Sequence, residues 1–210
     1  MTIGLILGSG VYTDGNKQYS DYLDESLKTV LSKKVDYIIP CGGITNPNLL
    51  TLSESKSIKQ YLLKINPELA ANFIIEDKSL TSLQNLQFAR DILIKRNITP
   101  DDLYICCDSI RAPKNFYCAA TLFNSYLKLN VNEEEIYTVL ATELISQKFK
   151  LRERVTLSLK NIHIEGIPLD REIDEIAEQI ASSLLEVGFS KYPALHEKGI
   201  QYRKKIWGME

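Results

Sequence analysis

The chain has 210 residues, of which 44% are hydrophobic and 25% are charged, and its formal net charge is −2. These values are typical of a globular protein with one substantial core. Acidic and basic residues are interspersed, which excludes the basic footprint of a typical nucleic-acid-binding protein. No apolar run approaches the roughly 20 residues of a membrane span, and no signal peptide precedes the first predicted strand. We therefore expect neither secretion nor membrane insertion.

The first predicted element is a buried strand from Ile3 to Leu7, which leads into the turn Gly8-Ser9-Gly10. A short apolar run bounded by glycine is typical of the centre of a parallel sheet. Glycine permits positive φ and close approach of a ligand, and exposed N–H groups in such a turn can face an anion. The motif lacks the third glycine of a dinucleotide fingerprint and the Gly-Lys-Ser/Thr of a Walker A loop. A plain tight turn is the alternative.

Predicted helices and strands alternate over the next hundred residues. Helices are expected over 20–33, 51–64, 81–95 and 113–127, and strands over 35–40, 73–76 and 103–107. Two of these helices open with the spacing of a capping box, Thr51 with Glu54 and Thr81 with Gln84.

The last third of the chain has a less regular pattern. Residues 136–141 (IYTVLA) predict a fifth strand, 143–160 a mixed helical pattern, and 162–167 a short strand or an extended connection. Residues 170–187 predict an amphipathic helix that ends at Gly188, and 191–210 either a last turn of helix or a mobile tail.

Strands that alternate with helices predict an α/β fold. We expect an open, mostly parallel sheet with helices on both faces and a helical C-terminal segment. The chain is predicted to be a single domain, with a core over 1–142 and a helical extension over 143–210.

The four cysteines, Cys41, Cys106, Cys107 and Cys118, have no C-x-x-C spacing. Cys106 and Cys107 are adjacent in an apolar run, where neighbouring side chains of a strand point to opposite faces. This arrangement favours free thiols over a disulfide framework, and a reduced, cytoplasmic protein is the expectation. A nucleophilic role for Cys41 is disfavoured because no histidine lies near it in the sequence.

Ligands of open parallel α/β sheets bind beyond the carboxyl ends of the strands. Four polar loops are predicted at this edge, over 8–10, 41–43, 76–85 and 108–111. Helix N-termini near these loops favour an anionic ligand, and Arg111 can bind a phosphate or carboxylate with two hydrogen bonds. The expected convergence of the loops is the main sequence evidence for a binding site.

The residues expected to bind the ligand lie in these loops: Gly8, Ser9, Gly10, Gly42, Gly43, Ser79, Thr81, Asn85 and Arg111. The candidate catalytic acids or bases are Glu54, Glu76 and Asp108.

Plainer alternatives exist for most of these residues. Glu54 can close the capping box of Thr51, Glu76 can be a solvated acid at a strand end, and Asp108 can cap the next helix or hold a metal. For the others the alternatives are capping and turn roles (Ser79, Thr81, Asn85) and a surface ion pair (Arg111).

These residues resemble the YdcF-like domain, also called the ElyC/SanA/YdcF family. The resemblance rests on Gly8-Ser9-Gly10, on Gly42-Gly43, on Glu54 at the start of a helix, and on the loop from Asp108 to Ala112. Its most distinctive part is the segment 75–85 (IEDKSLTSLQN), which is similar to the E-x-x-S-x-(N)T-x-x-N signature of the family. The match covers roughly residues 1–125.

The resemblance implies a Rossmann-like fold, and one cytoplasmic branch of the family is associated with S-adenosylmethionine, which makes it a possible cofactor. The sequence departs from the family at two points. We expect it to lack the N-terminal membrane anchor of the envelope members, and it has Asp108 where many members have a histidine three residues before Arg111.

The function we expect is binding of a nucleotide-like or phosphate-bearing small molecule, in a transferase or hydrolase if the protein is catalytic. One alternative is a non-catalytic interaction or regulatory module related to envelope biogenesis, in which 143–160, 170–187 and the aromatic tail form a partner surface. Another is a metal-dependent phosphohydrolase that uses Asp14, Glu76 and Asp108. The primary interpretation assigns no metal ligand and leaves the oligomeric state open.

Overall fold

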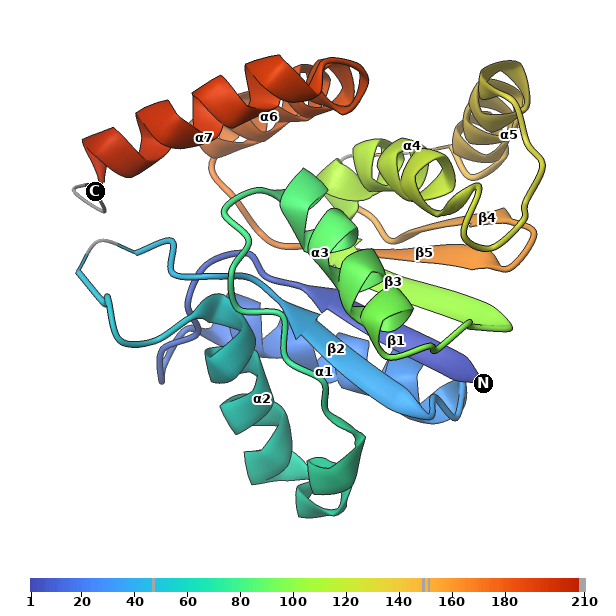
Figure 1. Cartoon of the computed structure of the whole chain (residues 1–210). Helices are drawn as coiled ribbons and strands as arrows, with labels where there is room; N and C mark the ends of the chain where they lie inside the picture. Colours follow the sequence, from blue (N-terminus) through green and yellow to red (C-terminus); the bar gives the residue numbers. More distant parts are fainter. Residues whose placement is uncertain (47, 149, 151, 208–210) are drawn as a thin grey trace.

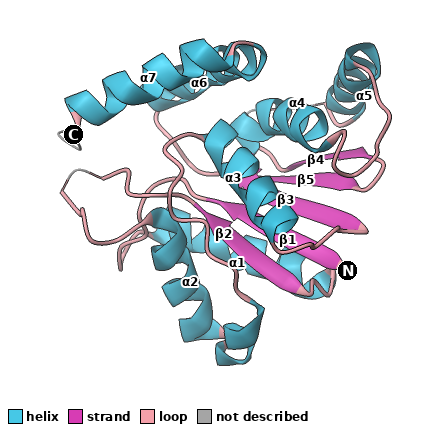
Figure 2. Cartoon of the chain, viewed as in Figure 1, coloured by secondary structure: helices cyan, strands magenta, loops and turns pink. Residues whose placement is uncertain are grey.

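The sheet of the protein has five strands in the order β2-β1-β3-β5-β4. A computed structural model describes residues 1–46, 48–148, 150 and 152–207. The strands are β1 (Thr2–Leu7), β2 (Tyr37–Cys41), β3 (Asp102–Asp108), β4 (Val155–Leu159) and β5 (Ile162–Ile167). β2, β1, β3 and β5 are parallel, and β4 runs antiparallel to β5 at the edge. The predicted α/β class with a mostly parallel sheet is confirmed (Figure 2).

Helices cover both faces of this sheet, as predicted (Figure 1). Successive residues of β1 show the two faces, because Leu5 belongs to one hydrophobic cluster and Ile6 to the other. The Ile6 face packs against α1 (Lys17–Ser32) and α2 (Glu54–Ile65). The Leu5 face packs against α3 (Ser82–Lys95), α4 (Ala112–Phe123) and α5 (Glu133–Ser146). Two short 3₁₀ helices, η1 (Pro67–Asn72) and η2 (Ser109–Arg111), complete this part.

Two further helices, α6 (Ile173–Lys191) and α7 (Pro193–Ile206), end the described chain. They lie side by side at the top of Figure 1, with α6 packed against α4. The tail predicted as a turn of helix or a mobile end is therefore mostly helix. Within the described residues, no helix is long and apolar enough to cross a membrane.

Three segments differ from the sequence predictions. The predicted strand 136–141 lies inside α5, because Asn132 and Glu135 form a capping box and the first turn holds three glutamates that favour a helix start. The predicted strand 73–76 makes only two isolated parallel bridges to β2, at Phe73 and Glu76. The segment 143–210, predicted as a helical extension, also contributes β4 to the sheet, whereas β5 confirms the short strand that was one prediction for 162–167.

Candidate functional site

A polar cavity of about 230 Å³ lies beyond the carboxyl ends of the parallel strands. The chain passes from β1 to β2 on one side and later to β3 on the other side, so the loops after β1 and β3 diverge. Such a switch point is the usual ligand position in an open α/β sheet. Eight of the twelve residues that the sequence singled out line this cavity: Gly8, Ser9, Gly10, Glu54, Ser79, Thr81, Asn85 and Arg111.

Glu54 is the predicted acid that lines the cavity. Ser53 caps α2, so the predicted capping box between Thr51 and Glu54 is not formed. The Glu54 carboxylate instead accepts a hydrogen bond from the Thr45 hydroxyl and is buried. Burial raises its pKa, and the Thr45 hydrogen bond and the positive charge of Arg111 oppose this rise only in part.

Two glycines make room for the Glu54 side chain. A Cβ atom on Gly8 would overlap the Glu54 carboxylate, and one on Gly42 would lie 2.6 Å from Glu54 Cβ. Gly42 also has a φ of 144°, which side chains disfavour. Gly42 and Gly43 are buried outside the cavity lining, so their role is to pack the loop against Glu54 and the 76–79 segment.

The backbone amides of these turns are already hydrogen bonded within the protein. Gly8 N–H donates to Cys41 O over 2.8 Å, Ser9 N–H to the Tyr19 hydroxyl, and Gly43 N–H to Ser79 O. The first amides of α2 likewise donate to the carbonyls of the 42–43 turn. A cradle of free amides, as the glycine pattern predicted, is therefore not present at these positions, and a ligand would meet mainly side chains.

Glu76 holds the 77–79 loop in place and does not line the cavity. Its carboxylate accepts hydrogen bonds from Lys78 N, Ser79 N and Gly42 N and from the Ser79 hydroxyl, at 2.5 to 3.2 Å. The Ser79 hydroxyl also contacts Asn85 Oδ1. Glu76 is thus neither a solvated acid nor a group that reaches the cavity, and it positions Ser79 and Asn85 there.

Thr81 has the capping role that was the plainer alternative. Its hydroxyl accepts from Gln84 N at the start of α3 and lies 3.1 Å from His196 Nε2. Its side chain still borders the cavity, so capping and lining are both observed.

Three cationic side chains line the cavity. Arg111 donates from Nε to Gln179 Oε1 over 2.6 Å, and no carboxylate of the described residues lies within 4.0 Å of its guanidinium. Lys114 is 2.9 Å from Glu186 in a buried ion pair, and the Glu186 carboxylate also accepts a hydrogen bond from Leu83 N–H at the start of α3. Arg203 donates to Leu80 O and lies over the Trp207 ring. Arg111 is therefore the cation best placed to meet an anion.

Asp108 lies behind the cavity and has the capping role. It accepts Ile110 N–H at the start of η2 and the Nε–H of Arg171 over 2.9 Å. Arg171 also donates from Nη2 to the Ser9 hydroxyl over 2.5 Å. Asp108 thus orients Ser9 through Arg171 and does not contact the cavity itself.

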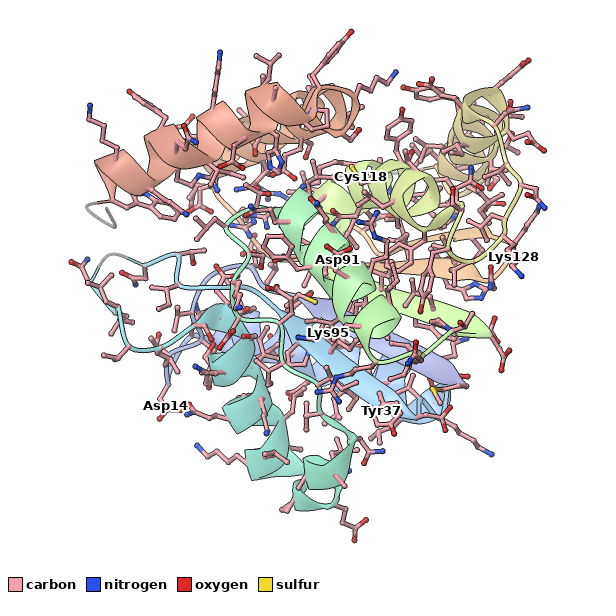
Figure 3. All side chains as sticks on the ribbon, viewed as in Figure 1. Asp14, Tyr37, Asp91, Lys95, Cys118 and Lys128 are labelled. Carbon is pink, nitrogen blue, oxygen red and sulfur yellow. The ribbon has the colours of Figure 1, made fainter. Side chains whose placement is uncertain are left out.

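The three carboxylates proposed for a metal do not converge. Asp14 is exposed on the outer side of α2, where it is 3.7 Å from Lys64 (Figure 3). Glu76 is hydrogen bonded to the backbone of the 77–79 loop, and Asp108 is hydrogen bonded to Arg171, as described above. Among the residues that the structure describes, no group of three His, Cys, Asp or Glu side chains could hold a metal ion.

Sequence reasoning missed several residues at the site. Lys114 follows Arg111, the N-cap residue of α4, by three positions; this spacing places both on one side of the helix start and was a usable signal. Arg171, Glu186 and Arg203 come from the C-terminal third of the chain, and no local motif marks them. Only the packing of α6 and α7 over the strand ends brings these side chains to the 8–10 and 79–85 loops.

No family model and no curated protein matches this sequence. The resemblance to the YdcF-like domain stays a prediction from the motifs.

Proposed function

We propose that the protein binds a small phosphate-bearing molecule in the polar cavity, with Arg111 as the main contact to the phosphate. The observation that carries this proposal is the guanidinium of Arg111. It borders the cavity, is oriented through Nε by Gln179, and has no carboxylate partner in the described chain. A guanidinium with free Nη groups suits two hydrogen bonds to phosphate oxygens.

The charges of the other lining residues support the same assignment. Glu186 neutralises Lys114, so this pair adds no net charge to the cavity. Arg111 and Arg203 then face one unpaired acid, Glu54, whose neutral form is favoured by burial. An anion gains from this balance, and a metal ion does not.

Glu54 is our candidate for the acid or base of a group-transfer or hydrolysis reaction. Of the three predicted carboxylates it is the one that lines the cavity, and its pKa lies above that of an exposed glutamate. A raised pKa brings the group closer to the range in which it can both give and take a proton near neutrality. We do not assign this role to Glu76 and Asp108, because hydrogen bonds hold both carboxylates behind the cavity.

The cavity is small for a complete nucleotide or for S-adenosylmethionine. Its volume of about 230 Å³ is below the roughly 300–1,000 Å³ of common ligand sites. We therefore propose that it receives the charged head of the ligand, and we keep membership of the YdcF-like family and a cytoplasmic location as parts of the proposal. Four free, buried thiols agree with a reducing compartment.

Calorimetric titration tests this function. Inorganic phosphate, glycerol phosphate, AMP and S-adenosylmethionine are titrated into the wild type, Arg111→Gln and Arg96→Gln. Arg96 is exposed at the end of α3, outside the cavity lining, and serves as the matched control. We expect at least one phosphate to bind, with affinity reduced about tenfold or more in Arg111→Gln only. Equal affinities of the two variants, or no phosphate binding at all, would refute the proposal.

One observation favours the interaction-module alternative. α6 exposes Ile173 at 74% and Leu184 at 72%, while it turns Gln179 and Glu186 toward the cavity. A partner could cover the exposed apolar side chains. Light scattering on the wild type and Leu184→Glu distinguishes the cases, because a self-associating surface predicts a loss of mass in the variant and a monomer predicts none.

A further inference from the structure

A second hollow, of about 530 Å³, lies between α6 and α7. We call it the helix groove. Apolar and aromatic side chains make up much of its lining: Leu185 and Phe189 from α6, and Ile200 and Tyr202 from α7. Two small residues, Ala181 and Gly199, leave its space open, because a Cβ on Gly199 would only touch the Phe189 ring at 3.7 Å. A groove of this size and character can accept an apolar group.

The helix groove adjoins the polar cavity. Five residues border both: Thr81, Ser182, Glu186, Arg203 and Trp207. The boundary therefore combines a guanidinium with an indole ring, whose centre lies 5.3 Å from the Arg203 guanidinium carbon. A ligand that crosses this boundary would place its charged part on the Arg111 side and its apolar part on the Phe189 side.

We infer that the ligand is a phosphate monoester with a bulky apolar alcohol part, whose phosphate lies in the polar cavity and whose apolar part lies in the helix groove. This inference rests on the proposed function. Charge complementarity sets the orientation, because Arg111 is in the polar cavity and Arg203 at the boundary, while the inner side of the groove presents Leu185, Phe189 and Ile200. An apolar group gains by leaving water for such a surface, and a phosphate does not.

The small volume of the polar cavity explains why a ligand with a bulky apolar part needs a second compartment. Its volume of about 230 Å³ suits a phosphate with a few attached atoms. The adjoining groove is more than twice as large. Although Glu178 and Glu186 are among its lining residues, most of its exposed lining surface is apolar, so it adds room for an apolar body. His196, which could otherwise contact a ligand there, is bonded to Thr81 and stacked on Phe189.

The test compares phosphates that share a head and differ in the body. Affinities of inorganic phosphate, glycerol phosphate and 1-naphthyl phosphate are measured for the wild type, Gly199→Leu and Ala194→Leu. Leucine at 199 fills the groove and replaces a helical glycine, which favours the helix. Ala194 is exposed on the same helix and outside the groove lining, so Ala194→Leu is the matched control. Ala181→Leu fills the groove from α6 and gives an independent variant.

We expect 1-naphthyl phosphate to bind the wild type and Ala194→Leu at least about tenfold more tightly than glycerol phosphate does. Gly199→Leu and Ala181→Leu should lose this advantage and keep their affinity for glycerol phosphate. Equal affinity of both esters for the wild type would overturn this inference and leave the proposed function standing. A wild type that binds none of the phosphates would overturn both.

Discussion

Glu54 shows how one buried side chain accounts for several features of the sequence. Its side chain occupies the space that Gly8 and Gly42 leave, and its carboxylate accepts a hydrogen bond from the Thr45 hydroxyl. One glycine of each pattern that suggests a phosphate loop, Gly8 of Gly-Ser-Gly and Gly42 of Gly-Gly, is explained here by the packing of an acid. The acid then lies at the cavity with a pKa raised by burial.

The raised pKa of Glu54 predicts a specific dependence of stability on pH. Because the folded-state pKa lies above the ordinary value of 4.5, the neutral form stabilises the folded state below that value. This contribution is lost as pH rises through the folded-state pKa. Glu54→Gln cannot titrate, so its free energy of unfolding should increase relative to the wild type between about pH 4 and pH 8. Urea unfolding at several pH values measures the difference.

The control for this prediction is Glu68→Gln, because Glu68 is exposed on η1 and outside the cavity lining. Its stability curve should run parallel to that of the wild type. If the Glu54→Gln curve is also parallel, burial does not disfavour the charged form of Glu54, and its role as a proton-transfer group loses its basis.

Two glycine replacements should have opposite effects on stability. A Cβ on Gly43 would overlap Ser79 O, which is backbone and cannot move aside easily. Gly43→Ala should therefore lower the free energy of unfolding by about 1–3 kcal/mol. Gly188 lies in α6 with nothing within 4 Å of an added Cβ, so Gly188→Ala should raise it by about 0.5–1 kcal/mol. Thermal denaturation of both variants decides this, and equal effects would contradict the packing described here.

At the residue level, the sequence pattern located much of the cavity lining. Ser9 and Arg111 could be predicted because each follows a strand, and Asn85 because it follows the 73–76 segment, which bridges β2 in parallel; the ends of parallel strands share one edge. The roles of Glu76 and Asp108 could not be predicted, since a strand-end carboxylate looks the same in the sequence whether it faces a ligand or the backbone. Their hydrogen bonds depend on the exact position of the 77–79 loop and of Arg171.

At the level of elements, a buried ion pair connects three helices. Lys114 of α4 and Glu186 of α6 are almost fully buried, and Glu186 also accepts Leu83 N–H at the start of α3. This explains why α6 turns polar residues inward, an orientation opposite to that expected from its apolar periodicity. Of the apolar residues of α6, Val187 and Phe189 pack against the core, Leu185 and Phe189 border the helix groove, and Ile173 and Leu184 remain exposed.

Removal of one member of this pair should be strongly destabilising. Lys114→Met leaves Glu186 buried without its cation, and we expect a loss of about 3 kcal/mol in the free energy of unfolding. Lys114→Met combined with Glu186→Gln should recover most of this loss, because the glutamine oxygen can still accept Leu83 N–H. Chemical denaturation of the single and double variants tests this. A double variant as unstable as the sum of both single variants would contradict the coupling.

The elements that the sequence analysis predicted wrongly have local causes. Residues 136–141 are rich in strand-forming side chains, but the Asn132–Glu135 capping box and the preceding acids start a helix before them. Val155, Leu157 and Leu159 alternate with polar residues, which is a strand pattern, and a mixed helical interpretation of 143–160 hid it. A segment of five residues is too short for its hydrophobic periodicity to distinguish a strand from a helix.

At the level of the whole molecule, strand order and the C-terminal helices together build the site. The sheet places the loops after β1 and β3 at a switch point, which the alternation of strands and helices allows one to expect. The contribution of α6 and α7 to the lining of the cavity could not be expected, because contacts such as Arg203 to Leu80 O join segments more than 120 residues apart in the sequence. The site is thus a joint product of the sheet edge and the last two helices.

The most direct test of the binding proposal is a crystal structure of the protein with glycerol phosphate. We predict phosphate oxygens within hydrogen-bond distance of the Arg111 guanidinium, in the space between Ser9 and Asn85. A phosphate bound elsewhere while this cavity stays empty at saturating ligand would contradict the account.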